Sequence, residues 1–272
     1  MNVSREAMWD DAPRTKLRGV FRHLTAFLSS LGWAAQILCE SVLAFPSVVC
    51  RRDGRRDLFR QLYSTGIRTL PVVTVVSLFM GMILALQVGL ELRRFNQEIY
   101  LGAAVMVSLI REMGPFSCGM CLAACVGSAI AAELGTMKVN DEIAALEIMS
   151  ISPIRFLAAP RILALVLMAP LLAFFCCIIG AVGGGVVGAT QLGVDFQQYM
   201  ASAMSIADAK DLYVGLLKAL VFGIVIGTVS VAEGFGTELG ATGVGKSTQR
   251  SVIASFLLIL MFGYMVTRIC YR

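Results

Sequence analysis

Long apolar runs, more than any single motif, decide what this chain can fold into. Of its 272 residues, 57% are hydrophobic and only 15% are charged, and the mean hydropathy is +0.78. These values lie well outside the range of soluble domains. A helix needs about 20 apolar residues to cross a bilayer, so the length allows roughly five or six crossings once loops are subtracted. The sequence therefore predicts one all-α integral membrane protein.

Five predicted spans follow an N-terminal segment of different character. Residues 1–66 are predicted to be cytoplasmic, and the mixed apolar and polar stretch 17–49 is predicted to lie in the membrane interface as a helix. The N-terminus lacks the short apolar core and small-residue cleavage site of a removable signal peptide. Residues 67–272 form the predicted transmembrane domain, with spans at about 70–90, 102–132, 157–190, 213–232 and 252–267.

Basic residues cluster ahead of the first span and predict its orientation. They are Arg51, Arg52, Arg55, Arg56, Arg60 and Arg68. Because cytoplasmic flanks of membrane helices carry excess Lys and Arg, the N-terminus is predicted to be cytoplasmic. Five crossings then place the loops 133–159 and 233–251 on the same side. A nucleic-acid patch is the other reading of a basic run, but it does not fit beside so much membrane sequence.

The second span contains an Arg-Glu pair within apolar sequence. Arg111 and Glu112 precede Pro115 in the run AAVMVSLIREMGPFSCGM. A charge at the centre of a membrane helix costs about 2.5 to 3.5 kcal/mol, so something must compensate this pair. The two side chains either neutralise each other for structural ends, or Arg111 faces an anionic head group in an internal cavity. Intramembrane ionisable residues usually mark a substrate path, which favours the second alternative.

An apolar stripe at the end of the first span is a candidate lining for such a cavity. Its members are Leu84, Val88, Leu92 and Phe95, which recur at about helical spacing. Ordinary packing against lipid or a neighbouring helix is the other explanation. Spacing alone leaves both open.

The loop between the second and third spans carries the most information. The run ELGTMKVNDEIAALEIMSISPIRF predicts a short amphipathic helix, with Asn140 as its cap, Asp141 and Glu142 in its first turn and Pro153 at its end. A capped helix on the cytoplasmic side is suited to a groove in another protein. An interfacial helix without a partner is the alternative.

Two further motifs are not expected to carry chemistry. Cys118, Cys121 and Cys125 spell C-x-x-C-x-x-x-C, but they lie in an apolar span where we expect them to share one helix face and pack as small residues. No metal site is predicted. The run 240–247, GATGVGKS, fits a phosphate-binding glycine loop, yet it joins two spans instead of following a strand. With no nucleophile beside a base, no catalytic residue is predicted.

Taken together, three runs resemble the MlaE/YrbE permease family, the membrane subunit of ABC transporters that work with MCE proteins. They are SLIREMGP, ELGTMKVNDEIAALEIMSISPIRFLAAPRILA and GATGVGKSTQRSVIAS. The resemblance covers roughly residue 60 to the C-terminus. The chain departs from the family at Cys125-Val126, where a basic residue often stands, and at Gly263, where an acidic residue often stands.

This resemblance implies a function and a set of partners. It implies a homodimeric permease in the bacterial inner membrane, with a cytoplasmic ABC ATPase, a periplasmic MCE-domain lipid-binding protein and a small cytoplasmic regulatory subunit. Phospholipid would move between the inner and outer membranes, and ATP and Mg would be bound by the ATPase alone. The loop helix 133–152 would couple to the ATPase. Its implied contact residues are Glu133, Asn140, Asp141, Glu142 and Glu147, while Arg111 and Glu112 would lie in or near a lipid cavity between protomers.

A different class of function also fits the charges. Arg111, Glu112 and Lys218 could serve an ion- or proton-coupled secondary transporter, which needs no ATPase. An intramembrane lipid-modifying enzyme would need an acid-base or metal cluster that the sequence does not offer. Copurification of an ATPase separates the first two alternatives.

Overall fold

The computed structural model describes Gly32, residues 36–41, Leu43, residues 52–206 and residues 208–271. The described chain is helical and contains no strand. Most of the predicted interfacial helix 17–49 falls outside the described residues. Five helical stretches are long and apolar enough to cross a membrane, which confirms the predicted number of spans. They are Gly54–Arg94, Glu98–Val139, Ile154–Gln191, Ala209–Phe235 and Ala241–Cys270.

The first stretch consists of two helices separated by a short turn. Helix α2 (Arg52–Thr65) leads through residues 66–69 into α3 (Leu70–Arg94), where Pro71 occupies the first turn that tolerates its missing N–H. Helix α3 packs along α8 (Ala159–Gln191) through glycines. A Cβ on Gly81 would lie 2.0 Å from the carbonyl oxygen of Gly180. Only hydrogen at this position lets the two backbones approach so closely.

Two π-helical turns interrupt the second stretch. A π turn adds one residue to a helical turn and rotates the side chains that follow, and such turns are frequent at functional sites. The first π turn contains the predicted Arg-Glu pair. In chain order the stretch comprises η1 (Glu98–Tyr100), α4 (Leu101–Ser108), η2 (Leu109–Met113), α5 (Gly114–Leu122), η3 (Ala123–Gly127) and α6 (Ser128–Val139).

The remaining elements correct two sequence predictions. Helix α11 (Ala241–Cys270) begins eleven residues before the predicted fifth span, so the glycine pattern is the first two turns of a helix, following Gly240 at φ 95°. Helix α9 (Phe196–Ile206), between α8 and α10 (Ala209–Phe235), was not predicted. A third π turn, η4 (Ile154–Ala158), starts the third stretch, and α7 (Glu142–Ile148) precedes it.

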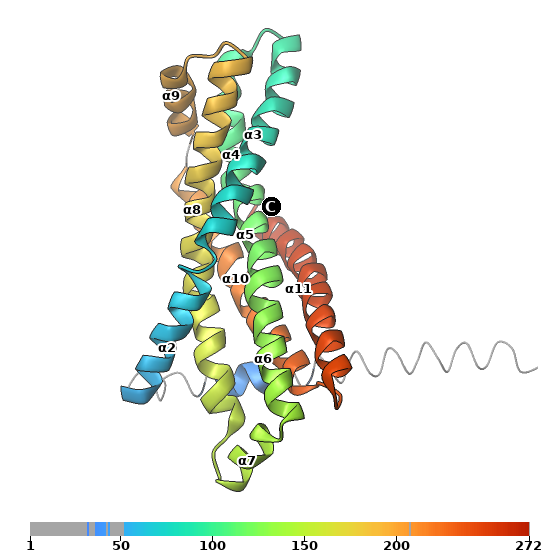
Figure 1. Cartoon of the computed structure of the whole chain (residues 1–272). Helices are drawn as coiled ribbons and strands as arrows, with labels where there is room; N and C mark the ends of the chain where they lie inside the picture. The colour runs from blue at the N-terminus through green and yellow to red at the C-terminus, as the bar shows by residue number, and fades with distance from the viewer. Residues whose placement is uncertain (1–31, 33–35, 42, 44–51, 207, 272) are drawn as a thin grey trace, which may run out of the picture.

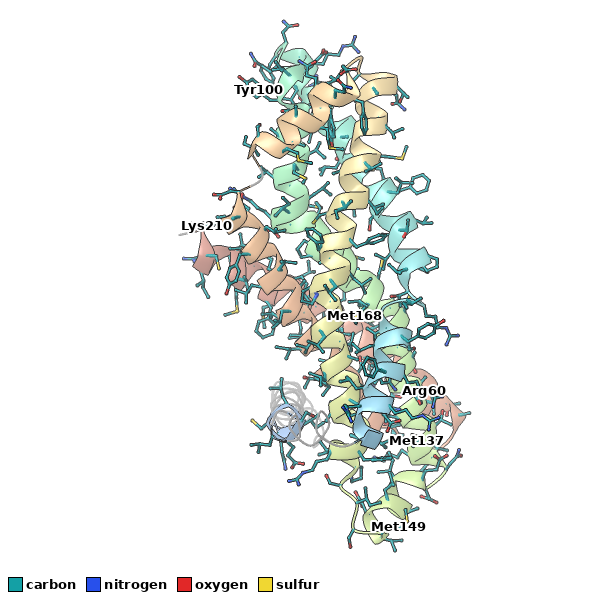
Figure 2. The ribbon with its side chains drawn as sticks, turned by 90° about the vertical axis from the view of Figure 1, so that its left-hand side faces the viewer. Arg60, Tyr100, Met137, Met149, Met168 and Lys210 are labelled. Atoms are coloured by element: carbon teal, nitrogen blue, oxygen red, sulfur yellow. The ribbon has the colours of Figure 1, made fainter. Side chains whose placement is uncertain are left out.

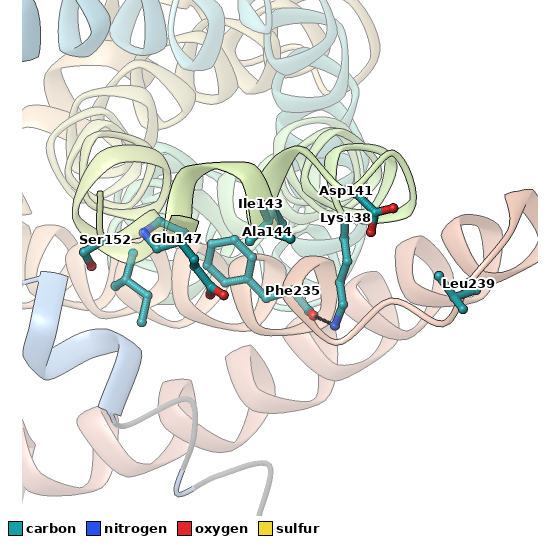
Figure 3. A pocket seen from close by; sticks show the side chains of 10 residues that line it. Lys138, Asp141, Ile143, Ala144, Glu147, Ser152, Phe235 and Leu239 are labelled. Carbon is teal, nitrogen blue, oxygen red and sulfur yellow. Dashed lines mark hydrogen bonds between the residues drawn. The ribbon is translucent and has the colours of Figure 1, made fainter. Parts of the chain in front are cut away.

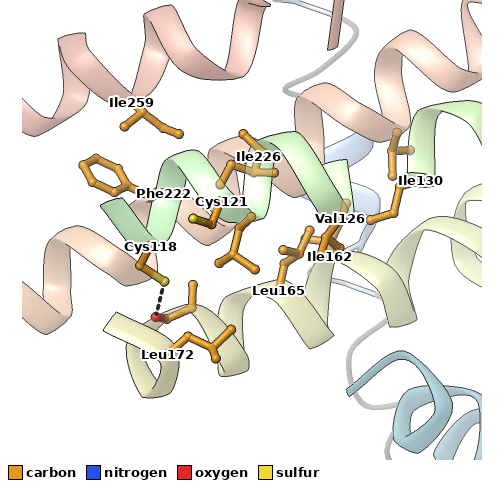
Figure 4. Close-up of a cluster of buried hydrophobic side chains, with 14 of the residues drawn as sticks. Cys118, Cys121, Val126, Ile130, Ile162, Leu165, Leu172, Phe222, Ile226 and Ile259 are labelled. Carbon is orange, nitrogen blue, oxygen red and sulfur yellow. Dashed lines mark hydrogen bonds between the residues drawn. The ribbon is translucent and has the colours of Figure 1, made fainter. Parts of the chain in front are cut away.

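The helices form two tiers that share α8 (Figure 1). The upper tier combines α3, α4 and α9 with the second half of α8, and the lower tier combines α5, α6, α10 and α11 with the first half. The upper core includes Ala85, Leu101, Val105, Leu109, Ala181 and Tyr199. The lower core includes Cys118, Leu122, Leu165, Phe222, Ile226 and Ile259 (Figure 4).

The cysteine motif is only partly as predicted. Cys118 and Cys121 are buried in the lower core, whereas Cys125 is exposed. The π turn η3 contains Cys125 and rotates it away from the other two, so the three do not share one face. Within the described residues no group of three or more His, Cys, Asp or Glu is placed to hold a metal ion.

Candidate functional site

The π turn η2 lies at the junction of the two tiers and presents the predicted Arg-Glu pair to helix α10. Leu109 and Ile110 of this turn are buried, while the side chains of Arg111 and Glu112 remain 44% and 47% exposed. Figure 2 shows the neighbouring Lys210, at the start of α10, part-way along the bundle between Tyr100 and Met149. Arg111 and Glu112 therefore lie level with the start of α10 and the C-terminal end of α11.

Arg111 is paired with an acid that the sequence analysis did not single out. Its Nε donates to Oδ2 of Asp211 at 2.8 Å, and the Asp211 side chain is only 6% exposed. The Tyr271 hydroxyl donates to Oδ1 of the same carboxylate at 2.7 Å, and the guanidinium carbon of Arg111 lies 4.7 Å from the centre of the Tyr271 ring. Burial and then the hydrogen bond to Asp211 raise the pKa of Tyr271 to about 12.

Glu112 is paired with Lys218, two and a half turns into α10. The Lys218 ammonium, 1% exposed, donates to Glu112 Oε1 and to the Arg111 carbonyl, each at 2.6 Å. The Thr267 hydroxyl reaches Glu112 Oε1 at 2.8 Å, with the Gly263 carbonyl as a second acceptor at the same distance. Gly263 thus borders this network through its backbone carbonyl.

Both pairs have the same layout, with the buried charge on α10 and the half-exposed charge on η2. A buried ion without its partner costs several kcal/mol, so each half-exposed residue compensates the charge of its buried partner. A glycine makes this approach possible. A Cβ on Gly215 would lie 2.4 Å from the Ile110 carbonyl oxygen, so α10 packs directly on the backbone of η2. The site is a layer of paired opposite charges that is buried on the α10 side and half-exposed on the η2 side.

The predicted apolar stripe does not meet this layer directly. Leu84, Val88 and Leu92 are half-buried and pack against the upper core, of which Leu109 is a member. Phe95 caps α3 and is 72% exposed. Their role in binding lipid stays a prediction.

The loop between the second and third spans forms a shorter helix than predicted. Helix α7 covers only Glu142–Ile148, and residues 133–139 instead continue α6. Asn140 is the C-cap of α6, and Asp141, in the left-handed region at φ 58°, occupies the N-cap position of α7 without a capping hydrogen bond. The predicted capping role of Asn140 is therefore wrong. The reason is that α6 extends beyond its apolar span, which ends near residue 132.

A cavity of about 500 Å³ lies against α7 (Figure 3). Its walls come from the end of α6, from α7 and the following loop, and from the end of α10. The Lys138 ammonium crosses to the Phe235 carbonyl and ties α6 to α10 at this level. Glu142, Glu147 and Ile148 of α7 are exposed, Ile148 to 85%.

Glu133 lies on α6 and pairs with a buried arginine. The Arg161 guanidinium, 5% exposed, contacts Glu133 Oε1 at 3.0 Å and donates to the Leu157 carbonyl at 2.6 Å. Because Glu133 precedes α7 and Arg161 follows it, this ion pair closes the base of the hairpin that carries α7. Sequence reasoning assigned Glu133 to this region and missed Arg161.

Asp211 and Tyr271 are the other residues that sequence reasoning missed. One available signal was the spacing of Asp211 and Lys218, which lie seven residues apart and therefore share a face of α10. Tyr271 gave no signal beyond its position at the end of an apolar helix. Their partners on η2 depend on a π turn, which hydrophobic periodicity does not reveal.

Five spans, an internal layer of paired charges and an exposed helix between the second and third spans are the features of a polytopic membrane transport subunit. The sequence model described as Permease MlaE matches residues 58–269, and the chain belongs to this family. It is 35% identical over 253 residues to a probable ABC transporter permease protein of Rickettsia typhi, covering 93% of this chain and 96% of that protein.

Two further relatives extend the comparison. The chain is 30% identical over 246 residues to the intermembrane phospholipid transport system permease protein MlaE of Haemophilus influenzae, covering 90% of this chain and 93% of that one. It is 31% identical over 212 residues to the chloroplastic protein TRIGALACTOSYLDIACYLGLYCEROL 1 of Arabidopsis thaliana, covering 78% and 61%. The chain is accordingly an ABC transporter permease of the MlaE family.

Proposed function

We propose that this permease moves phospholipids between the inner and outer membranes of a bacterium, driven by ATP that a separate subunit hydrolyses. The observation that carries the proposal is the likeness along 90% of the chain to a permease named for intermembrane phospholipid transport. The paired charges of η2 and α10 support it, because a half-exposed Arg-Glu pair beside apolar spans suits an amphiphilic substrate with a charged head group.

The lipid would lie in a cavity between two copies of the chain. Helix α11 supports this arrangement, because only 17% of its most apolar stretch is buried within the chain. The corresponding share is 28% to 61% for the other four spans. An apolar surface of this extent in a membrane faces lipid, a second protein or both. Arg111 and Glu112, held by their partners on α10, would border the cavity, and Leu84, Val88, Leu92 and Phe95 would contribute apolar wall.

Helix α7 would transmit the ATPase cycle. Its exposed acids and Ile148 are available to a cytoplasmic ABC ATPase, which would bind the ATP and Mg, while this chain would hold no cofactor. A two-residue turn, Asn140 and Asp141, joins α7 to a continuous helical path that runs through α6, η3 and α5 to Glu112. A displacement of α7 could therefore be transmitted along these helices to the paired charges. The Glu133–Arg161 ion pair would keep α6 and α8, the two helices that flank α7, moving together.

The remaining partners follow from the family resemblance. The opposite end of the bundle, near α9, would face a periplasmic MCE-domain lipid-binding protein, and a small regulatory subunit would join the ATPase in the cytoplasm. The N-terminus would be cytoplasmic, in agreement with the arginines of α2.

Purification of the tagged chain in mild detergent, with mass spectrometry of bound proteins and lipids, tests the proposal. We expect an ABC ATPase, an MCE-domain protein and phospholipid. A preparation that retains transport activity in membranes but contains no ATPase would contradict the proposal and favour the ion-coupled alternative through Arg111, Glu112 and Lys218.

A further inference from the structure

A second hollow lies at the C-terminal end of α11, beside the paired charges. Its volume is about 350 Å³, and Tyr264, Thr267, Arg268 and Tyr271 line it. All four belong to the last two turns of the helix and the residue after it.

Two of the four lining residues direct their hydroxyls inward. Thr267 reaches Glu112, and Tyr271 donates to Asp211. The Arg268 guanidinium, in contrast, is exposed and makes one side-chain hydrogen bond within residues 52–206 and 208–271, from Nη1 to the Tyr264 hydroxyl at 3.1 Å. Arg268 therefore keeps most of its five N–H donors free for a ligand. A guanidinium suits phosphate in particular, because two parallel N–H groups match two phosphate oxygens.

Charge at the hollow favours an anion over a cation. Tyr271, which lines the hollow, has two cations near its ring: the Lys210 ammonium is 5.9 Å and the Arg111 guanidinium carbon 4.7 Å from the ring centre. Asp211 and Glu112 are each already in contact with a basic group at 2.8 Å or less. Arg268 and Lys210 remain as the cations of this surface without a carboxylate within ion-pair distance among the described residues.

The rest of the helix face indicates what is attached to the anion. Leu257, Met261, Tyr264 and Arg268 follow one another at intervals of four, three and four residues, so they lie on one face of α11. Leu257 is 59% exposed, Met261 50% and Tyr264 64%. A free phosphate would use only the Arg268 end of this face. A phospholipid would use all of it, with acyl chains along Leu257 and Met261 and phosphate at Arg268.

We propose that Arg268 is the phosphate-binding residue of a phospholipid subsite on α11, with Tyr264 orienting its guanidinium and Leu257 and Met261 contacting the acyl chains. This assignment rests on the proposed function and refines it. Arg111 is already held by Asp211 and Tyr271, so the head group meets Arg268 first. Thr267 and Tyr271 separate the bound phosphate from Glu112 and Asp211, which places the subsite at the entrance to the paired charges.

A photoreactive lipid tests this assignment on the full complex in nanodiscs. The probe is phosphatidylglycerol with a diazirine in one acyl chain, and the attachment sites are found by mass spectrometry. We expect labelling on α11 near Leu257 and Met261, reduced about tenfold in Arg268→Gln, because a charge-assisted contact is lost. Arg250→Gln is the matched control, since Arg250 is an exposed arginine on the same helix at its other end, and its labelling should equal that of the wild type.

Further probes make each result decisive. Diazirine-bearing diacylglycerol, which lacks phosphate, should label α11 weakly, and equal labelling by the two probes would overturn the assignment. Inorganic phosphate should not displace the lipid. Full displacement would make the hollow a free-anion site and would overturn the assignment as well.

Unchanged labelling of the Arg268→Gln variant would also overturn the assignment. If that variant does not fold, the attachment sites and the diacylglycerol comparison on the wild type still decide. Recovery of the ATPase and phospholipid with wild type is scored separately, so failure of the subsite is distinguishable from failure of the proposed function.

Discussion

The α3–α8 contact and the η2–α10 contact hold neighbouring spans together by different means. At the first, Gly81 and Gly180 bring two backbones together among apolar side chains. At the second, Gly215 allows close approach, but two ion pairs with buried members on α10 complete the contact. Close backbone packing has one low-energy arrangement, whereas paired charges can exchange partners with a charged ligand and stay compensated. We therefore expect the first contact to stay fixed and the second to rearrange during transport.

Substitution of Gly81 by Leu should have the largest effect. The new side chain would meet the Gly180 backbone, which cannot move aside, so we expect the variant to lose about 3 kcal/mol or more of stability and to be recovered poorly as folded protein. Thermal unfolding in detergent and gel filtration measure this. Gly245→Ala on α11, where a Cβ meets nothing within 4 Å, should stay within about 1 kcal/mol of the wild type. Equal behaviour of the two variants would remove the distinction between the contacts.

Substitution of Glu112 by Gln should come next, because it leaves the Lys218 ammonium buried without a carboxylate. The expected loss is about 3 kcal/mol in unfolding free energy. Lys218→Met should cost less, since the Glu112 left behind is half-exposed to begin with. The double variant should recover much of the Glu112→Gln loss, and a double-mutant cycle of thermal unfolding measures the coupling. Additive effects would show that the two charges are not a functional pair.

Substitution of Tyr271 by Phe should have a moderate effect of about 1 kcal/mol, because one hydrogen bond to Asp211 is lost. The pKa of Tyr271 is raised from 10.0 to about 12, so the folded state favours the neutral phenol. Its contribution should be fully present below pH 10 and should disappear as the pH rises from 10 to 12. Unfolding of both proteins across this range measures it. A constant difference between wild type and variant would contradict the hydrogen bond.

Substitution of Glu142 by Lys in α7 should leave stability within about 0.5 kcal/mol of the wild type, because the side chain is exposed. We expect it to weaken ATPase association, measured by copurification at matched expression. Arg155→Gln, at an exposed position of η4, is a control for loss of a surface charge. Full ATPase recovery with Glu142→Lys would count against α7 as the contact.

Much of the architecture was predictable from the sequence because a bilayer imposes its own length and polarity on every span. The five spans and the all-α class were confirmed on this basis. Boundaries were less accurate where helices extend past the apolar core, as α6 does beyond residue 132 and α11 does before residue 252. Polar sequence at those ends resembles a loop in hydropathy and continues as helix in the structure.

The candidate site was predictable only in part. Arg111 and Glu112 stood out because charge is rare in apolar sequence, but their partners did not. Asp211 lies near the polar start of α10, and Tyr271 follows the last helix, so neither appears out of place in the sequence. The π turns at η2 and η3 also changed which residues share a face, as the separation of Cys125 from Cys118 and Cys121 shows. Such turns depend on tertiary packing and leave no periodic signal.

Reconstitution tests the central claim most directly. The purified complex would be placed in liposomes with fluorescent phospholipid, and lipid reaching acceptor vesicles would be followed with and without ATP. The account predicts ATP-dependent transfer that requires the ATPase subunit. Transfer should fall strongly in each of the single variants Glu112→Gln and Glu142→Lys. Transfer that proceeds equally without ATP, or that follows an imposed ion gradient instead, would contradict it.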